Sequence, residues 1–244
     1  DAGSPRLMRA GLVGERCVAA GHDVLWWSGR FDHATMKHRE GPSFQKTAAG
    51  DVVLLDGASY PRNVSVARVR NHRQMARDFT AQSVRHEPPN VIVASYPTIE
   101  LAEAAIAYGR SHGVPVIVDV RDLWPDLFLD ILPRWARWLG RIALTPMYRA
   151  KRAVMRDADA VFAINDDFLA WASDAGDRSR MAADRVYPLA YQRTSYSADV
   201  LARASASWTE LGLQGHHKIA CFFGNLSARV LDLDLVLEAA RVLQ

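Results

Sequence analysis

Short apolar runs separated by stretches with helical spacing recur along this chain and constrain its fold more than any other feature. Each run is four or five residues long, as expected for a strand buried on both faces. The runs are Val24–Trp27, Val52–Leu55, Val91–Ala94, Val116–Val120, Val161–Ile164 and Ile219–Phe223. Alternation of such strands with helices is typical of a parallel α/β sheet. We therefore predict a Rossmann-like parallel sheet with helices on both faces.

Proline and glycine mark the bounds of two predicted helices. Apolar residues recur with helical spacing between Leu101 and Tyr108, and Gly113 ends this helix because glycine readily adopts the left-handed conformation found at helix C-termini. The first predicted helix begins at Pro5 and ends at Gly21. Each helix precedes a predicted strand, as the alternating pattern requires.

Two long segments depart from this pattern. Ser28–Gly50 has no clear periodicity and mixes basic residues with glycine and proline, which predicts a long mobile loop. Tyr191–Gly215 has few strand signals and one predicted helix, 197–211. We therefore place a domain boundary within the second segment, before the strand predicted at 219–223.

Composition excludes several classes of protein. The chain has 244 residues, of which 49% are hydrophobic and 23% charged, as in ordinary globular proteins. Cys17 and Cys221 are far apart in sequence, so they predict neither a disulfide framework nor a zinc site, and a reducing compartment fits best. No apolar run approaches the roughly 18 residues that span a bilayer. We expect a protein that is soluble or lies on a surface.

The positive charge is concentrated in two stretches. Seven Lys or Arg and no acid occur from Arg134 to Arg156, and five arginines and no acid occur from Arg62 to Arg77. In the first stretch, a basic helical face adjoins an apolar one. The basic residues are Arg134, Arg137 and Arg141, and the apolar ones are Trp135, Trp138, Leu139 and Ile142. This pattern favours either an anionic membrane surface or a helix packed on the sheet with a solvated basic side. No motif for nucleic acid is present.

Polar residues follow several apolar runs, and ligands of open parallel sheets bind at the carboxyl ends of the strands. These residues are Ser95, Tyr96, Arg121, Asp122, Asn165, Asp166 and the turn Gly224, Asn225, Leu226 and Ser227, with Arg229 beyond it. Gly3 and Ser4 precede the helix that begins at Pro5. Free backbone N–H groups at such positions bind anions, and simple helix capping or a tight turn explains the same residues equally well.

Arg121 and Asp122 form the strongest predicted pair. A carboxylate at a strand end can orient a hydroxyl or accept its proton, and a neighbouring guanidinium favours the ionised form and can bind phosphate. The alternative is that Asp122 caps the following turn while Arg121 pairs with an acid elsewhere. Trp124 and Leu127 are predicted core residues.

Several segments together resemble the family 4 glycosyltransferases of the GT-B fold, particularly bacterial polysaccharide and cell-envelope enzymes. The segments include GSPRLMRAGLVGERCVAAGHDVLWW, VIVASYPTIELAEAA, VIVDVRDLWPDLFLD and CFFGNLSARVLDLDLVLEAAR. The similarity runs over nearly the whole chain, and DLWPD is its most specific part.

The resemblance implies a domain organisation and a set of site residues. Residues 1–190 would form the amino-terminal, acceptor-binding lobe without its first strand, 191–216 an interlobe linker, and 217–244 the truncated start of the nucleotide-sugar-binding lobe. The resemblance implies that Asp122 and Arg121 are catalytic and that Ser95 and Tyr96 lie on the acceptor side. The implied donor-binding residues are Gly3, Ser4, Gly224, Asn225 and Arg229.

The chain departs from the family pattern at three places. Arg121 stands where many members have a histidine before the aspartate, and the hinge has Pro188 followed by Leu-Ala-Tyr-Gln where Pro-Asn-Gly-Val-Asp is frequent. The paired glutamates that hold the donor in the family would lie beyond Gln244.

The function implied by the resemblance is transfer of a sugar from a nucleotide sugar to a lipid-linked or saccharide acceptor, with retention at the anomeric carbon. No metal or other cofactor is expected, because backbone N–H groups and cations can neutralise the diphosphate leaving group. The expected location is the cytoplasm, with the inner face of the membrane as a peripheral site. The alternative is a non-catalytic acceptor-lobe module that docks on a membrane or on a separate donor-lobe subunit.

Overall fold

The computed structural model describes residues 9–62, 65–130, 132–189, 196–213 and 233–242. The chain forms two compact units, Asp1–Gln192 and Arg193–Gln244. The strand predicted at 219–223 lies outside the described residues, and so do the predicted donor-side residues Gly3, Ser4, Gly224, Asn225 and Arg229.

The first unit contains a parallel sheet of four strands in the order β6-β7-β8-β9. The strands are β6 (Ile92–Tyr96), β7 (Val116–Val120), β8 (Ala160–Ala163) and β9 (Arg185–Val186). Three of these strands were predicted from apolar runs, within two residues of their bounds. The register pairs Tyr96 with Val120 and Val120 with Ala163, so the carboxyl ends of β6, β7 and β8 meet at one edge. The predicted Rossmann-like α/β fold is confirmed.

A second sheet in the same unit has the order β1-β5-β4. β1 (Leu25–Gly29) pairs in parallel with β5 (Gly50–Leu55), and β4 (Phe44–Thr47) is antiparallel to β5. A short antiparallel pair, β2 (Phe31–Asp32) and β3 (Lys37–His38), precedes β4.

The prediction of a structureless loop at 28–50 is therefore wrong. Its strands are two to four residues long and mostly polar, so they show no alternation that a sequence pattern could detect. Arg30 holds the segment together, because its guanidinium donates hydrogen bonds to Gly41 O at 3.1 Å, Ser43 Oγ at 2.6 Å and Asp56 Oδ1 at 2.8 Å.

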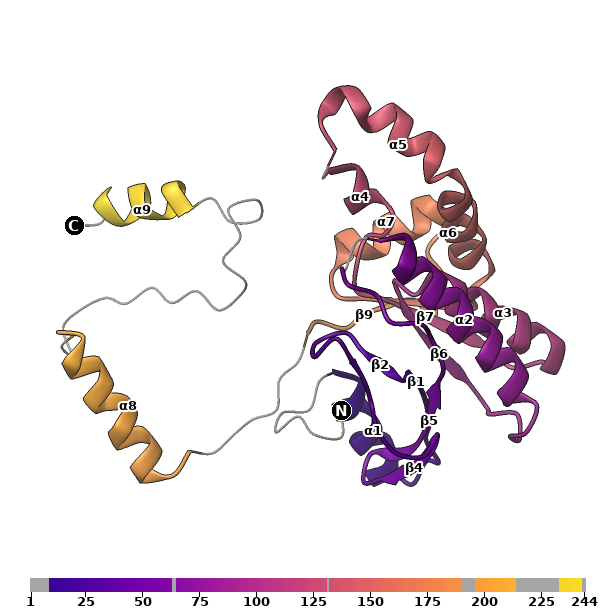
Figure 1. Cartoon of the computed structure of the whole chain (residues 1–244), viewed down its shortest axis with the longest axis horizontal. Helices are drawn as coiled ribbons and strands as arrows, with labels where there is room; N and C mark the ends of the chain where they lie inside the picture. The colour runs from indigo at the N-terminus through magenta and orange to yellow at the C-terminus, as the bar shows by residue number, and fades with distance from the viewer. Residues whose placement is uncertain (1–8, 63–64, 131, 190–195, 214–232, 243–244) are drawn as a thin grey trace. The chain divides into compact units, whose positions relative to one another are not determined.

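Helices connect the strands and cover the sheets. Those of the first unit are α1 (Arg9–Ala19), α2 (Val66–Ser83), α3 (Ile99–His112), α4 (Asp126–Asp130), the 3-10 turn η1 (Arg134–Ala136), α5 (Arg137–Ala143), α6 (Thr145–Asp157) and α7 (Asp166–Gly176). α1 and α2 lie on opposite sides of β1 and β5 (Figure 1), and α3 packs against β6 and β7. The second unit contains α8 (Ala198–Glu210) and α9 (Leu233–Val242).

The helix ends follow the predicted capping chemistry. Gly113 ends α3 with φ 67°, and Gly21 has φ 86° beyond the end of α1, both in the left-handed region. Asn165, which was considered as a strand-end ligand, caps α7 by accepting a hydrogen bond from Phe168 N at 2.9 Å. Ser197 caps α8 in the same way, which confirms the helix predicted at 197–211.

The core of the first unit lies between the four-stranded sheet and the helices α3, α6 and α7. Alternate residues of β7, Val116, Val118 and Val120, are at most 2% exposed, and Ile99 of α3 and Leu169 of α7 are equally buried. Burial of alternate side chains fixes the register of β7, because a slip of one residue would turn the polar positions inward.

We predict that Gly109→Ala destabilises the domain. An alanine in a helix normally adds up to about 1 kcal/mol of stability over glycine. Here the new Cβ would lie 2.5 Å from Val114 O and against the Val116 side chain. Overpacking of this kind costs about 1–3 kcal/mol, so the free energy of unfolding measured by urea titration should fall. Ser111→Ala, in the same turn, is the control. A variant as stable as the wild type would contradict the close packing of α3 on β7.

Candidate functional site

Two charged residues at the end of β7, Asp119 and Arg121, lie on one face of the sheet and pair with each other. Asp119 is almost buried, and Arg9 of α1 donates hydrogen bonds from Nη2 and Nε to its two carboxylate oxygens at 3.2 and 3.4 Å. Arg121 lies on the same side of the extended chain, with its Nε 3.6 Å from Asp119 Oδ2. The predicted alternative for Arg121, pairing with another acid, is therefore correct, and that acid is Asp119.

Asp122, the next residue, is half-buried and lies in the bend beyond the end of β7. Its Oδ1 accepts a hydrogen bond from the neighbouring Leu123 N at 2.9 Å. A helix cap would bond an N–H two or three residues on, and α4 begins only at Asp126, so the capping role stays a prediction. The described cation whose charge acts on Asp122 is Arg68 of α2. Burial lowers the pKa of Arg68 from its ordinary value, and the charges of Tyr60 and Asp122 partly oppose this effect.

Aromatic rings hold Arg68 at this position. Its Cζ lies 4.4 Å from the ring centroid of Trp124 and 5.7 Å from that of Tyr60. Trp124 is 6% exposed, which confirms the prediction of a core residue. The ring of His72 stacks on the ring of Trp124, with 5.9 Å between the two centroids. The result is a cation held by residues from α2, the β5–α2 connection and the turn after β7, and its charge interacts with that of Asp122.

Two further groups complete this cluster. His72 Nδ1 lies 3.5 Å from Glu100 Oε2, and His33 Nδ1 lies 3.1 Å from Tyr60 Oη. Burial lowers the pKa of His33, and the positive charge of Arg68 adds to this effect, so His33 is neutral at pH 7. Sequence reasoning missed this cluster. The only signal for it was the acid-free arginine stretch that contains Arg68.

The two predicted acceptor-side residues lie in different environments. Ser95 is exposed and pairs in register with Asp119, on the face of the sheet that carries Arg121. Tyr96 is fully buried, and its hydroxyl donates a hydrogen bond to Trp124 O. Burial also raises the pKa of Tyr96. Tyr96 was predicted to lie on the acceptor side. It lies in the core instead, where it supports the turn that carries Trp124.

The second aspartate of the DLWPD segment joins three elements. Asp126 at the start of α4 accepts hydrogen bonds from Tyr148 Oη at 2.8 Å, Lys151 Nζ at 2.9 Å and Trp171 Nε1 at 2.7 Å. Burial acts to raise the pKa of Asp126, but these hydrogen bonds together hold it below the ordinary value. Leu127, in contrast, is 40% exposed, so its prediction as a core residue is wrong.

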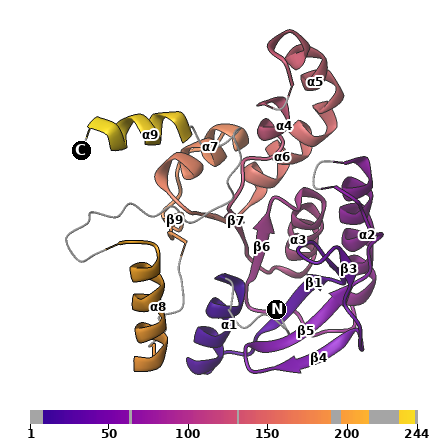
Figure 2. The ribbon, with the colours of Figure 1, turned by 60° about the vertical axis from the view of Figure 1, so that its left-hand side comes forward.

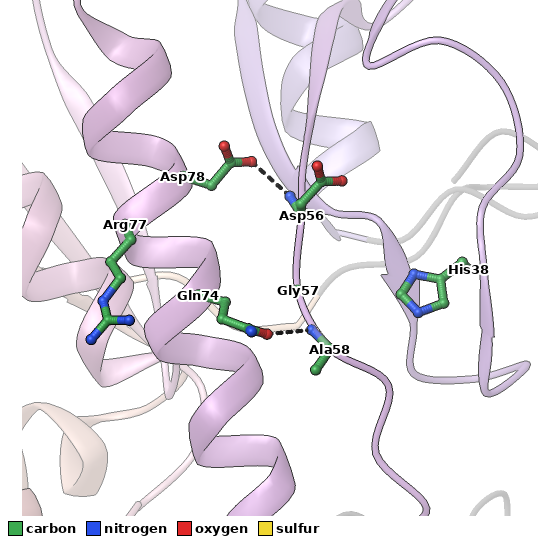
Figure 3. A pocket seen from close by; sticks show the side chains of 7 residues that line it. All are labelled: His38, Asp56, Gly57, Ala58, Gln74, Arg77 and Asp78. Atoms are coloured by element: carbon green, nitrogen blue, oxygen red, sulfur yellow. Dashed lines mark hydrogen bonds between the residues drawn. The ribbon is translucent and has the colours of Figure 1, made fainter.

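A hollow of about 570 Å³ lies at the carboxyl end of β5, between α2 and His38. Figure 3 shows Asp78 and Gln74 reaching from α2 to the backbone after β5, where they accept hydrogen bonds from Asp56 N at 2.7 Å and Ala58 N at 2.6 Å. These side chains therefore fix the β5–α2 connection, which leads to Tyr60. Of the predicted site residues that the structure describes, none lines this hollow.

Within the described ranges, no group of three or more His, Cys, Asp or Glu side chains is arranged to hold a metal ion. In the same part of the chain, no helix combines the length and the hydropathy needed to cross a membrane.

A parallel sheet flanked by helices, with charged residues at its strand ends, defines a Rossmann-like α/β domain. The family model described as a glycosyl transferase 4-like domain matches residues 8–189, and this range includes every strand that the structure describes, β1 to β9. The chain therefore belongs to this family of glycosyltransferases. None of the curated proteins compared with the chain matches it.

We predict that Asp126→Asn destabilises the domain. The amide keeps the shape of the side chain but leaves Lys151, which is 8% exposed, without its negative partner. Breaking a buried ion pair costs about 3–5 kcal/mol, and the partial exposure of Asp126 reduces the expected loss to about 2–3 kcal/mol. Urea titration measures this loss, with the exposed Asp174→Asn as the control. An equal effect of the two variants would show that the Asp126 hydrogen bonds contribute nothing specific.

The same network predicts a pH dependence. The pKa of Asp126 is lower in the folded chain than in the unfolded chain, so the folded state binds fewer protons. The contribution of Asp126 is therefore complete above about pH 4 and is lost as the pH falls through the folded-state pKa. The difference in unfolding free energy between wild type and Asp126→Asn should narrow in acid. A difference that is constant down to low pH would contradict the pKa assignment.

Proposed function

We propose that the chain carries the acceptor side of an enzyme that transfers a sugar from a nucleotide sugar to a lipid-linked or saccharide acceptor, with retention, in cell-envelope polysaccharide synthesis. The observation that carries the proposal is the position of Asp122. It follows the end of β7, is half-buried, and interacts electrostatically with Arg68, which Trp124 and Tyr60 hold in place. Membership of the glycosyl transferase 4-like family supports the reaction class.

In this proposal Asp122 accepts a hydrogen bond from the acceptor hydroxyl and orients its oxygen toward the donor sugar. One carboxylate oxygen of Asp122 is held by Leu123 N, which fixes the orientation of the group. Arg68 is a positioning residue, because its positive charge attracts the carboxylate and the rings around it limit its movement. Arg121 takes a different role from the one predicted: with Arg9, it offsets the charge of Asp119.

The remaining predicted residues complete the proposal. Ser95 lies on the acceptor side, and we assign the donor phosphates to Gly3, Ser4, Gly224, Asn225 and Arg229. Backbone N–H groups and cations there would neutralise the diphosphate without a metal ion. The enzyme would act in the cytoplasm, at the inner face of the membrane.

We predict that Asp122→Asn in the full-length enzyme lowers turnover by about 10²–10⁴-fold, because the amide orients the hydroxyl but cannot accept its proton. The amide oxygen can still accept the hydrogen bond from Leu123 N, so the free energy of unfolding should change by less than about 1 kcal/mol. Release of nucleoside diphosphate from UDP-, GDP- and ADP-linked hexoses measures turnover. Asp130→Asn, an exposed acid on α4, is the control. Equal turnover of Asp122→Asn and wild type would remove Asp122 from the mechanism.

A thermal-shift series separates the enzyme from a non-catalytic module. We predict that one of the nucleoside diphosphates UDP, GDP and ADP raises the melting temperature of the full-length protein, because a ligand that binds only the folded state stabilises it by about 2.7 kcal/mol at 100 times its dissociation constant. The corresponding nucleoside, which lacks the phosphates, serves as the control. No shift with any of the three would favour a module that binds acceptor or membrane alone.

A further inference from the structure

The segment formed by η1 and α5 exposes an apolar surface that the rest of the first unit leaves uncovered. Trp135 is 73% exposed, Trp138 61% and Ile142 63%, and Leu139 beside them is 47% exposed. Figures 1 and 2 both show α5 at the end of the unit, away from the strands, and its neighbours are α4, η1 and α6. The alternative that these residues pack on the sheet is therefore wrong.

Arginines surround this apolar surface. Arg134, Arg137 and Arg141 are exposed on the same short segment, and the chain has no acid from Arg134 to Arg156. Arg137 lies 3.6 Å from Asp130, whereas Arg134 forms no ion pair with any described residue. A protein partner that buried the two tryptophans would also have to supply acidic groups to pair with these arginines. An anionic lipid surface satisfies both requirements, because indole rings enter the acyl boundary and guanidinium groups remain among the phosphates.

A hollow of about 420 Å³ adjoins the apolar surface between α5 and α6. Its cations are Arg141, Arg149 and Arg152, whereas the hydroxyls of Thr145 and Tyr148, which also line it, already donate to Arg141 O and Asp126, so the guanidinium groups are its donors. Arg152 also pairs with Asp177 at 3.0 Å, whereas Arg149 forms no ion pair with the described part of the chain. Guanidinium donors around one hollow bind a phosphate oxygen well. Ile142 lines the hollow and is also part of the apolar surface, so the two features are continuous.

We propose that η1, α5 and the hollow beside α6 form a docking surface for anionic phospholipid, in which the apolar residues enter the membrane and the hollow receives a phosphodiester head group. The proposal deepens the proposed location at a membrane but does not depend on sugar transfer. Docking is measured without donor or acceptor, so its failure and the failure of the enzymatic proposal are separate results.

The test is co-sedimentation of the full chain with vesicles of phosphatidylcholine, alone or mixed with phosphatidylglycerol. We expect the chain to bind the mixed vesicles at least about tenfold more strongly, and binding to weaken as salt is raised, because surface charges are screened. Equal binding to both kinds of vesicle, or no binding to either, would overturn the proposal. In the second case, a protein partner would be the alternative occupant of this surface.

Two double variants identify the residues involved. Trp135→Ser with Trp138→Ser should weaken binding about tenfold or more, and Arg141→Ala with Arg149→Ala about twentyfold, since each arginine near an anionic surface contributes about fivefold. The matched controls are Trp208→Ser on α8, and Arg70→Ala with Arg77→Ala on α2, all at exposed positions.

All substituted side chains are exposed or half-exposed, so the variants should melt within a few degrees of the wild type. Loss of binding by the controls to the same extent as by the surface variants would overturn the assignment to α5 and α6.

Discussion

The parallel pairing of β7 with β6 on one side and β8 on the other determines where the polar groups of this domain lie. Val116, Val118 and Val120 turn toward the helices and are buried, so the alternate residues Asp119 and Arg121 must turn to the other face. The strand then ends, and the chain leads directly to Asp122 and Trp124. Burial of three valines thus fixes the face of the sheet on which Asp119 and Arg121 lie.

The carboxylates of Asp119 and Asp122 interact with different cations. Asp119 pairs with Arg9 and Arg121. Arg9 thereby ties α1 to the sheet, and it also donates hydrogen bonds to Tyr187 O and Pro188 O beyond β9. Asp122 instead interacts with Arg68. The ion pairs of Asp119 and the interaction of Asp122 therefore use different side chains, so each can be changed without directly removing a partner of the other.

The α5 surface belongs to the same unit but depends on different physics. Asp126 fixes α4 against α6 and α7 through Tyr148, Lys151 and Trp171, and the chain then continues through η1 into α5. Hydrogen bonds thus hold the base of this segment, while its tryptophans contribute nothing visible to the core. Apolar side chains kept in water on a well-anchored segment indicate a surface that is buried by something else.

The sequence alone determined β1, β5, β6, β7 and β8, because apolar runs of strand length carry their own signal, and it determined the helix ends at Gly21 and Gly113, whose backbone chemistry is local. It also indicated Asp122 and the basic segment at α5. Only the tertiary structure decided that Arg68 and not Arg121 is the cation that interacts with Asp122, that Tyr96 is buried, and that Trp135 and Trp138 are exposed. These outcomes depend on which side chains meet when α2, the turn after β7 and α5 take their places, and such contacts between distant residues leave no periodic pattern in the chain.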